Sequence, residues 1–276
     1  FTEDGKCFVD EIKGMYRRVE LFEKPVFVHR AQAMCYAYIF ALQNNMETIG
    51  IQMTYCNLET EQTKYFREEF SFEEIKKWFD DLMEEYGKWA TFQCEMKNQR
   101  QASIKELDFP FEYRPGQKKL VSDVYRTIMR QKLLFMQAPT GVGKTISTIF
   151  PAVKAVGEEL ADRIFYLTAK TITATVAKET FALLEKNGYR AKTIQITAKE
   201  KLCPCDEMEC NPVTCPYAKG HFDRVNDAVF DLLHRCEMIE RDDILSQADR
   251  YTVCPFELCL DTASWCDNII CDYNYV

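Results

Sequence analysis

In the second half of the chain, hydrophobic residues occur in two patterns, a helical periodicity and short continuous runs. From residue 117 to 130 apolar residues recur every three or four positions, which is typical of an amphipathic helix. Its apolar stripe is Leu120, Val121, Val124, Ile128 and Met129. Short apolar runs predict strands at Lys132–Met136, Arg163–Leu167, Thr193–Ile196 and Asn268–Cys271. Helices are predicted between them at 144–156, 172–187 and 255–265. This alternation predicts an α/β fold, a parallel sheet with helices on both faces.

The first part of the chain predicts a smaller unit. Asp4-Gly5 is a hairpin turn sequence, so Cys7–Lys13 is expected to be the second strand of a hairpin. An apolar helix starts near Arg30, and Thr48–Tyr55 predicts a further strand. A polar join near 98–101 and the sequence Phe109-Pro110-Phe111 then interrupt the pattern. We therefore expect two domains, at 1–98 and 109–276.

Composition narrows the class of protein. The 276 residues are 47% hydrophobic and 28% charged, and no apolar run approaches the ~18 residues of a membrane span. The start resembles no secretory signal and lacks Met, so we expect a cytoplasmic piece of a longer chain, with no membrane partner. A net charge of −8 argues against nonspecific coating of nucleic acid but leaves room for a local basic groove.

Residues 138–145 read as a phosphate-binding loop, in the order Ala138, Pro139, Thr140, Gly141, Val142, Gly143, Lys144 and Thr145. Between a strand and a helix, the glycines let backbone N–H groups surround an anion. Lys144 is then expected to reach the β/γ-phosphates, and Thr145 to offer its hydroxyl to Mg²⁺. The alternative is a chance Gly-Lys-Thr in a surface turn, and the first position carries Ala138 where Gly is usual.

Two flanking segments extend this interpretation. The segment containing Arg114 and Gln117 precedes the loop, and a Gln at a helix start can read adenine through its amide. Downstream, Lys170 follows a predicted strand at the ligand-binding edge of the sheet, where it suits a phosphate backbone. For the first segment, the alternative is an ordinary turn followed by a helix start. For the segment containing Lys170, the alternative is a helix cap followed by a solvated lysine.

Cysteines are the second chemical signal. The chain holds 13, and nine lie between Cys203 and Cys271. A first group lies among prolines that favour irregular loops, and Cys254 follows much later. The members of that group are Cys203, Cys205, Cys210 and Cys215. Such a thiolate set suits either Zn²⁺ or an iron–sulfur cluster, and the spacing alone does not choose.

The remaining nearby candidates have simpler interpretations. Cysteines at 236, 259, 266 and 271 are expected to be core or helix-face thiols. For His221, a capping or surface role is expected before metal ligation.

The first unit carries its own polar pattern. Glu11 and Lys13 point to one face of the predicted strand, which is the carboxylate and lysine that a metal-dependent phosphodiesterase needs. Gln32 and Tyr36 share one face of the following helix. The alternative is an exposed charged strand beside an amphipathic helix.

Together, the segments around Arg114–Gln117, 138–145 and 167–171 resemble the motifs of superfamily 2 iron–sulfur DNA helicases of the DinG/XPD type, over residues 111–276. That resemblance implies a RecA-like motor domain that uses ATP and Mg²⁺ to move along single-stranded or forked DNA, 5′ to 3′, in repair or replication. It also implies a 4Fe–4S insertion at about 201–255. The cluster ligands it implies are Cys203, Cys210, Cys215 and Cys254, with Cys205 as a substitute. The acidic Asp-Glu-Ala-His box and the second motor domain of such helicases are not in this sequence, so the chain alone is not expected to unwind DNA.

The pattern of Glu11 and Lys13 followed by Gln32 and Tyr36 resembles the RecB-type branch of restriction-endonuclease-like nucleases, over residues 1–95. That family also uses an Asp from a preceding strand, which this sequence does not contain. Two alternative functions remain open at this point. One is a redox-responsive iron–sulfur module that binds DNA, and the other is a nuclease whose motor only positions DNA.

Overall fold

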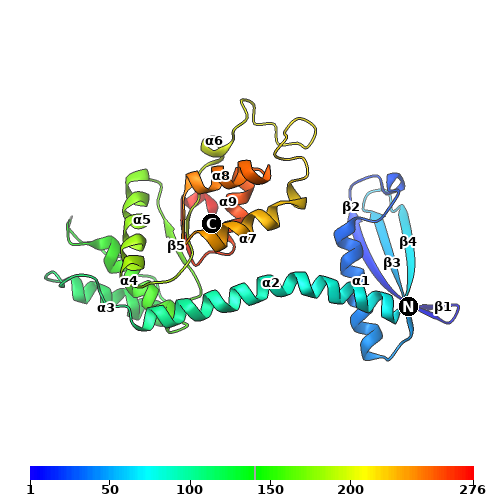
Figure 1. The fold of residues 1–276 in the computed structure, drawn as a ribbon, viewed down its shortest axis with the longest axis horizontal. Helices are drawn as coiled ribbons and strands as arrows, with labels where there is room; N and C mark the ends of the chain where they lie inside the picture. Colours follow the sequence, from blue (N-terminus) through cyan, green and yellow to red (C-terminus); the bar gives the residue numbers. More distant parts are fainter. Residues whose placement is uncertain (140) are drawn as a thin grey trace. The chain divides into compact units, whose positions relative to one another are not determined.

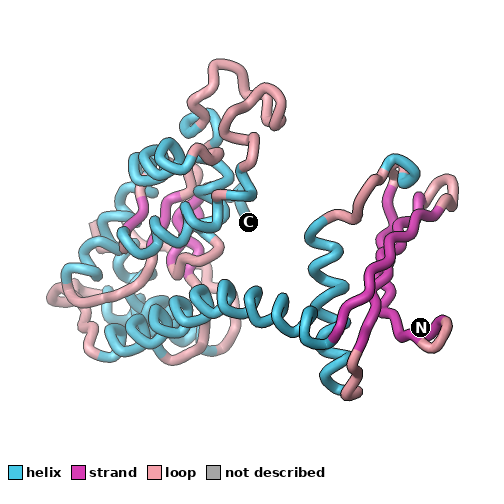
Figure 2. Tube along the Cα trace, turned by 45° about the vertical axis from the view of Figure 1, so that its right-hand side comes forward, coloured by secondary structure: helices cyan, strands magenta, loops and turns pink. Residues whose placement is uncertain are grey.

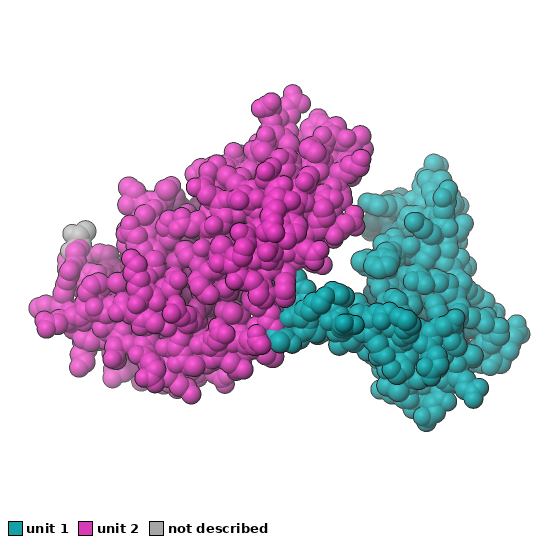
Figure 3. Space-filling model, in the orientation of Figure 1, with its two compact units in different colours: residues 1–91 teal, residues 92–276 magenta. Residues whose placement is uncertain are grey.

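A computed structural model of the chain describes residues 1–139 and 141–276. The chain divides into two compact units, Phe1–Thr91 and Phe92–Val276 (Figure 3). Helix α2 (Phe72–Lys105) contributes to both, and the polar segment at 98–101 lies inside it. None of the described helices is both long and apolar enough to cross a membrane.

The first unit is a four-stranded mixed sheet with helix α1 (Phe27–Gln43) against it (Figure 1). Its strands are β1 (Thr2–Glu3), β2 (Lys6–Met15), β3 (Thr48–Asn57) and β4 (Thr63–Ser71), in that spatial order. Strands β2 and β3 are parallel, whereas β3 and β4 are antiparallel. A 3-10 turn, η1 (Val19–Leu21), precedes α1.

The predicted hairpin is confirmed. Thr2 pairs with Cys7 and Glu3 with Lys6, so Asp4 and Gly5 form a two-residue turn. Both turn residues have positive φ, 51° and 78°, which is the backbone geometry that favours Asp-Gly between right-twisted strands. Small residues on α1, such as Ala33, Ala37 and Ala41, bring the helix close to the buried side chains of β3.

The second unit contains a four-stranded, all-parallel sheet, so the predicted α/β class is confirmed at that level (Figure 2). Its spatial order is β5 (Ile164–Leu167), β8 (Asn268–Cys271), β6 (Thr193–Gln195) and β7 (Met238–Ile239). In Figure 1 the strands lie between α5 on one side and α7, α8 and α9 on the other.

The helices of this unit follow the predicted ranges closely where a range was predicted. They are α3 (Gln117–Met129), α4 (Lys144–Gly157), α5 (Thr171–Lys186) and α9 (Pro255–Ala263). Elements without a predicted range are α6 (Lys199–Leu202), η2 (His221–Asp223), α7 (Val225–Arg235), α8 (Arg241–Tyr251) and η3 (Tyr273–Tyr275). Helices α4 and α5 bury Ile149, Phe181 and Leu184 in one core with Ile270 of β8.

The predicted strand at Lys132–Met136 is wrong. This segment is not a strand and pairs with no other strand among the described residues. Leu133 is 88% exposed and Phe135 is 94% exposed. An apolar run becomes a strand only where neighbouring backbone satisfies its N–H and C=O groups. Among the described residues, the parallel sheet ends at β5 and offers this segment no such partner.

Candidate functional site

The phosphate-binding loop ends at a helix N-terminus. Gly141 and Gly143 both adopt left-handed backbone conformations, with φ of 82° and 79°, and α4 begins at Lys144. Among the described residues no side chain caps this helix start, which leaves its first N–H groups and the positive end of its dipole without a side-chain acceptor there. Val142 and Thr145 are half-buried, and Thr140 lies outside the described residues.

The lysine of the loop is held by the loop itself. Lys144 Nζ donates hydrogen bonds to the carbonyl oxygens of Ala138 at 3.0 Å and Pro139 at 2.9 Å. An anion bound at the helix start would compete with these two carbonyl groups for the ammonium. The loop geometry therefore combines two features suited to phosphate, a helix N-terminus and an ammonium group held by carbonyl oxygens that phosphate could replace.

Arg114 and Gln117 contact this loop. Arg114 Nη1 donates to the carbonyl oxygen of Gly141. Gln117 is only 3% exposed, and its Oε1 accepts a 3.0 Å hydrogen bond from the Arg114 backbone N–H. Its Nε2 lies against Gly143. The structure thus brings both predicted nucleotide-binding residues to the glycines of the loop, with the Gln117 amide already engaged by the protein.

The carboxyl ends of the parallel strands form a separate pocket of about 350 Å³. It includes Lys170, the residue expected on the nucleic-acid side, together with Lys178, Lys201 and Arg241. Lys178 forms a 3.1 Å ion pair with Glu240. The Lys170 backbone N–H also donates to Thr168 Oγ1 at 3.2 Å, so this residue takes part in a local turn.

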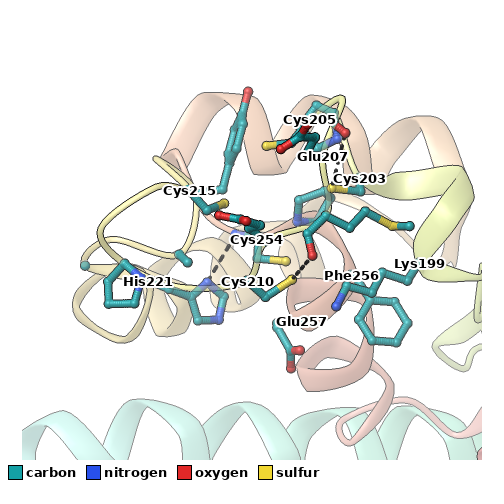
Figure 4. A pocket seen from close by; sticks show the side chains of 18 of the residues that line it. Lys199, Cys203, Cys205, Glu207, Cys210, Cys215, His221, Cys254, Phe256 and Glu257 are labelled. Carbon is teal, nitrogen blue, oxygen red and sulfur yellow. Dashed lines mark hydrogen bonds between the residues drawn. The ribbon is translucent and has the colours of Figure 1, made fainter.

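The cysteine-rich segment forms a pocket of about 520 Å³ (Figure 4). All five candidate thiols line it, namely Cys203, Cys205, Cys210, Cys215 and Cys254. Four come from the loops after α6, and Cys254 is the N-cap residue of α9. The other four late cysteines lie outside its lining, and Cys259, Cys266 and Cys271 are buried, as expected of core thiols.

The thiols interact electrostatically in two neighbouring sets, Cys205 with Cys203 and Cys215, and Cys254 with Cys210. Burial, with the thiols of Cys215 and Cys203, raises the pKa of Cys205 to about 11. Burial likewise raises the pKa of Cys254, with Cys210 contributing. Through a hydrogen bond, the Cys210 thiol raises the pKa of Lys199. The thiols are close enough to interact, yet no three His, Cys, Asp or Glu side chains of the described residues are grouped tightly enough to hold a single ion.

His221 lies at the edge of this pocket and is buried, at 4% exposed. Its Nδ1 accepts a 3.2 Å hydrogen bond from the backbone N–H of Cys254. Burial lowers the pKa of His221, which favours the neutral ring. His221 therefore caps the backbone N–H of Cys254 from a buried position.

Lys199 and His221 carry the interactions that the sequence-based reasoning missed. Only for Lys199 does the sequence spacing point to the cysteine site, because Lys199 lies one helical turn before Cys203. Nothing local in the sequence pairs His221 with Cys254.

In the first unit the four predicted polar residues form a chain of contacts. Lys13 Nζ lies 2.8 Å from Glu11 Oε1 and donates to Gln32 Oε1 at 2.9 Å. Gln32 Nε2 in turn lies 3.4 Å from Tyr36 Oη. His29, three positions before Gln32, was not predicted. Burial and then Lys13 lower its pKa, and its Nδ1 lies 3.3 Å from Tyr55 Oη.

The sequence was compared with protein families and with curated proteins. No family model matches the chain. No curated protein is significantly similar to it.

Proposed function

We propose that this chain is the N-terminal portion of an ATP-dependent DNA helicase of the iron–sulfur DinG/XPD type. A RecA-like motor domain at 109–276 would carry the cysteine insertion at 201–255 and follow a RecB-like, nuclease-type domain at 1–98. The observation that carries the proposal is a five-cysteine pocket in the same parallel α/β unit as the phosphate-binding loop. Either feature alone suits many protein classes, whereas their combination is specific to few.

The nucleotide step assigns roles to residues that already meet at the loop. Lys144 would exchange the carbonyl groups of Ala138 and Pro139 for phosphate oxygens. Thr145, in the first turn of α4, would offer its hydroxyl to Mg²⁺. Gln117 would contact adenine only after its amide leaves Gly143 or by using its remaining hydrogen-bonding capacity. Bound nucleotide is thus expected to reorganise the contacts between α3 and the loop.

Thiolates in this pocket suit a cluster or a zinc ion, and the proposed choice of a cluster follows from the family resemblance. Zinc holds thiolates at about 2.3 Å, which places sulfur atoms about 3.8 Å apart in a tetrahedral group. No such compact group occurs among the described side chains, yet five thiols share one pocket of about 520 Å³. Cys203, Cys210, Cys215 and Cys254 would hold a 4Fe–4S cluster, with Cys205 available as a substitute. The cluster would act structurally, cross-linking the irregular loops between α6 and η2 to the start of α9.

Nucleotide binding tests the motor assignment. Lys144→Ala should abolish ATP binding by this chain and DNA-stimulated ATP hydrolysis by the complete protein. Lys119→Ala is the matched control, because Lys119 is exposed on α3 and pairs only with Asp123 among the described residues. Turnover that is unchanged in the Lys144 variant would refute the assignment.

Metal analysis tests the cluster independently. Anaerobically purified protein should contain about four iron and four sulfide per chain. Stoichiometric zinc without iron or sulfide would overturn the cluster while leaving the nucleotide site untouched.

A second candidate function, DNA cleavage by the first unit, is favoured by one observation. The chain of contacts from Glu11 through Lys13 to Gln32 gathers a carboxylate and an ammonium on one sheet face beside α1. A divalent metal bound by Glu11 would then have a lysine within reach to position water. Cleavage of labelled DNA with Mg²⁺ or Mn²⁺ that is lost in Lys13→Ala, but kept in Lys6→Ala, would support it. Absence of cleavage in the complete protein would rule out this second candidate function.

A further inference from the structure

His221 connects the two chain segments that supply the cysteine pocket. Four of the thiols come from loops before His221, whereas Cys254 lies 33 positions after it. The ring reaches across this separation, since its Nδ1 accepts the backbone N–H of Cys254 at 3.2 Å (Figure 4). The contact therefore fixes the start of α9 relative to the cysteine-rich loops.

The direction of this hydrogen bond defines the tautomer. A backbone N–H can only donate, so Nδ1 must present its lone pair, and the proton of the neutral ring is on Nε2. Nε2 then has no lone pair to give a metal. It lies 3.8 Å from Asp261 Oδ2 on α9 and has no hydrogen-bond partner among the described residues. His221 is thus placed to hold a ligand residue rather than to be a ligand.

Arg224 supports the same junction one step further back. Its Nε donates to the Tyr251 carbonyl oxygen at 2.9 Å, and its Nη2 donates to that of Thr252 at 2.6 Å. Nη2 also donates to the Lys219 carbonyl oxygen at 2.8 Å. The backbone immediately before Cys254 is therefore held from the same segment as His221. Of these two side chains, only His221 bonds to Cys254 itself.

We propose that His221 is a positioning residue for the cysteine site, which keeps the Cys254 thiol in the pocket by holding the backbone N–H of that residue. The proposal rests on the proposed function, because it takes Cys254 as a metal ligand. Groups behind metal ligands typically change metal affinity by about 10–100-fold when removed. The His221 side chain that accepts this hydrogen bond is itself buried, at 4% exposed.

Three substitutions of His221 distinguish the effect of the hydrogen-bond acceptor from the effect of the imidazole ring. His221→Asn places an amide oxygen near the position of Nδ1 and keeps the acceptor. His221→Leu fills a similar volume without an acceptor, and His221→Gln moves the acceptor outward toward the position of Nε2. His234→Leu is the control, because His234 is exposed and lies outside the lining of the cysteine pocket. Its Nδ1 contacts the Phe230 carbonyl oxygen within its own helix, and its ring packs against Phe92 and Phe230.

The full 276-residue chain, loaded anaerobically with iron and sulfide, would be challenged with EDTA while cluster absorbance is followed. We expect His221→Leu and His221→Gln to lose metal roughly tenfold faster than the wild type. His221→Asn and His234→Leu should stay close to the wild-type rate. The reduction potential should follow the same order, with a shift in the Leu and Gln variants and none in the Asn variant.

Two results would overturn the proposal. One is equal release rates in wild type and in both the Leu and Gln variants. The other is release from His221→Asn as fast as from His221→Leu, because the acceptor would then be irrelevant. If the Leu variant does not fold, as judged by circular dichroism before loading, the comparison of Gln with Asn decides. The metal found in wild type tests the proposed function separately, since the ratio of release rates also applies to zinc.

Discussion

The side-chain amide of Gln117 packs directly against Gly143, at the junction between the phosphate-binding loop and α4. A Cβ atom at position 143 would lie 2.7 Å from Gln117 Nε2, closer than such atoms approach. Gly143 also has a φ of 79°, where a residue with a Cβ is strained. Backbone conformation and packing therefore both favour glycine at this position.

Gly143→Ala should accordingly destabilise the second unit and weaken nucleotide binding. Left-handed backbone alone costs about 1–2 kcal/mol for a residue with a Cβ, and displacement of the buried Gln117 side chain adds to this cost. Gly141→Ala is the matched control, since its φ of 82° carries the same strain but no described atom lies within 4 Å of the added Cβ. Thermal unfolding should show a larger loss for Gly143→Ala. Equal losses would contradict the packing contact.

Arg100 and Asp267 form a buried ion pair in the second unit, where Arg100 is 7% exposed. Burial raises the pKa of Asp267 and Arg100 opposes that increase. Arg100→Leu should therefore raise this pKa further and cost about 3–5 kcal/mol at neutral pH, the usual effect of leaving a buried charge without its partner.

The sign of the pH dependence follows from linkage. A carboxyl group with a raised folded-state pKa binds protons more tightly when folded, so its stability contribution is kept at low pH and is lost as pH rises through the folded pKa. The difference between wild type and Arg100→Leu should shrink as pH falls from 8 toward 5, measured by urea unfolding. Lys97→Leu on the same helix removes only an exposed pair with Glu159 and should change stability by less than about 1 kcal/mol. A loss for Arg100→Leu that does not depend on pH would contradict the account.

Much of the second unit could be predicted from the sequence because its signals are local. Gly143 before Lys144 marks a helix start, and the apolar run Asn268–Cys271 forms the central strand β8. The run Lys132–Met136 has the same apolar character, but a strand also needs a neighbouring backbone, which is non-local information. The segment at 225–251 received no prediction although it forms α7 and α8.

The candidate sites also combine features that local sequence patterns predict with features that depend on the fold. Cysteine spacing among prolines predicted a thiolate metal site, and these cysteines line one pocket. Alternation in β2 predicted that Glu11 and Lys13 share a face, as their 2.8 Å ion pair requires. In contrast, the bond between His221 and Cys254 joins positions 33 residues apart through a fold that no local pattern encodes. The contact of Gln117 with Gly143 was likewise invisible, because it depends on how α3 meets the loop.

Phe135 offers a direct stability test of the corrected segment. Because its side chain is 94% exposed, Phe135→Ala should change the free energy of unfolding by less than about 0.5 kcal/mol. Phe181→Ala is the matched comparison, since Phe181 is 1% exposed in the core and should lose about 3–5 kcal/mol. Chemical denaturation of both variants measures the contrast. A large loss at Phe135 would show that the segment is buried in this chain.

Lys199 provides the last prediction, which concerns the charge around the cysteine pocket. Its ammonium interacts with the Cys210 thiol and more weakly with Cys254, and it lies 5.9 Å from the centre of the Phe256 ring. A cluster bound by four thiolates is anionic, so a nearby cation stabilises the reduced state, which carries one more negative charge. Lys199→Gln should therefore lower the reduction potential, by on the order of tens of millivolts. Lys201→Gln on the same short helix is the control, because Lys201 lines the separate pocket at the strand ends. Redox titration of the loaded chain measures both, and equal potentials in the two variants would show that Lys199 does not act on the cluster.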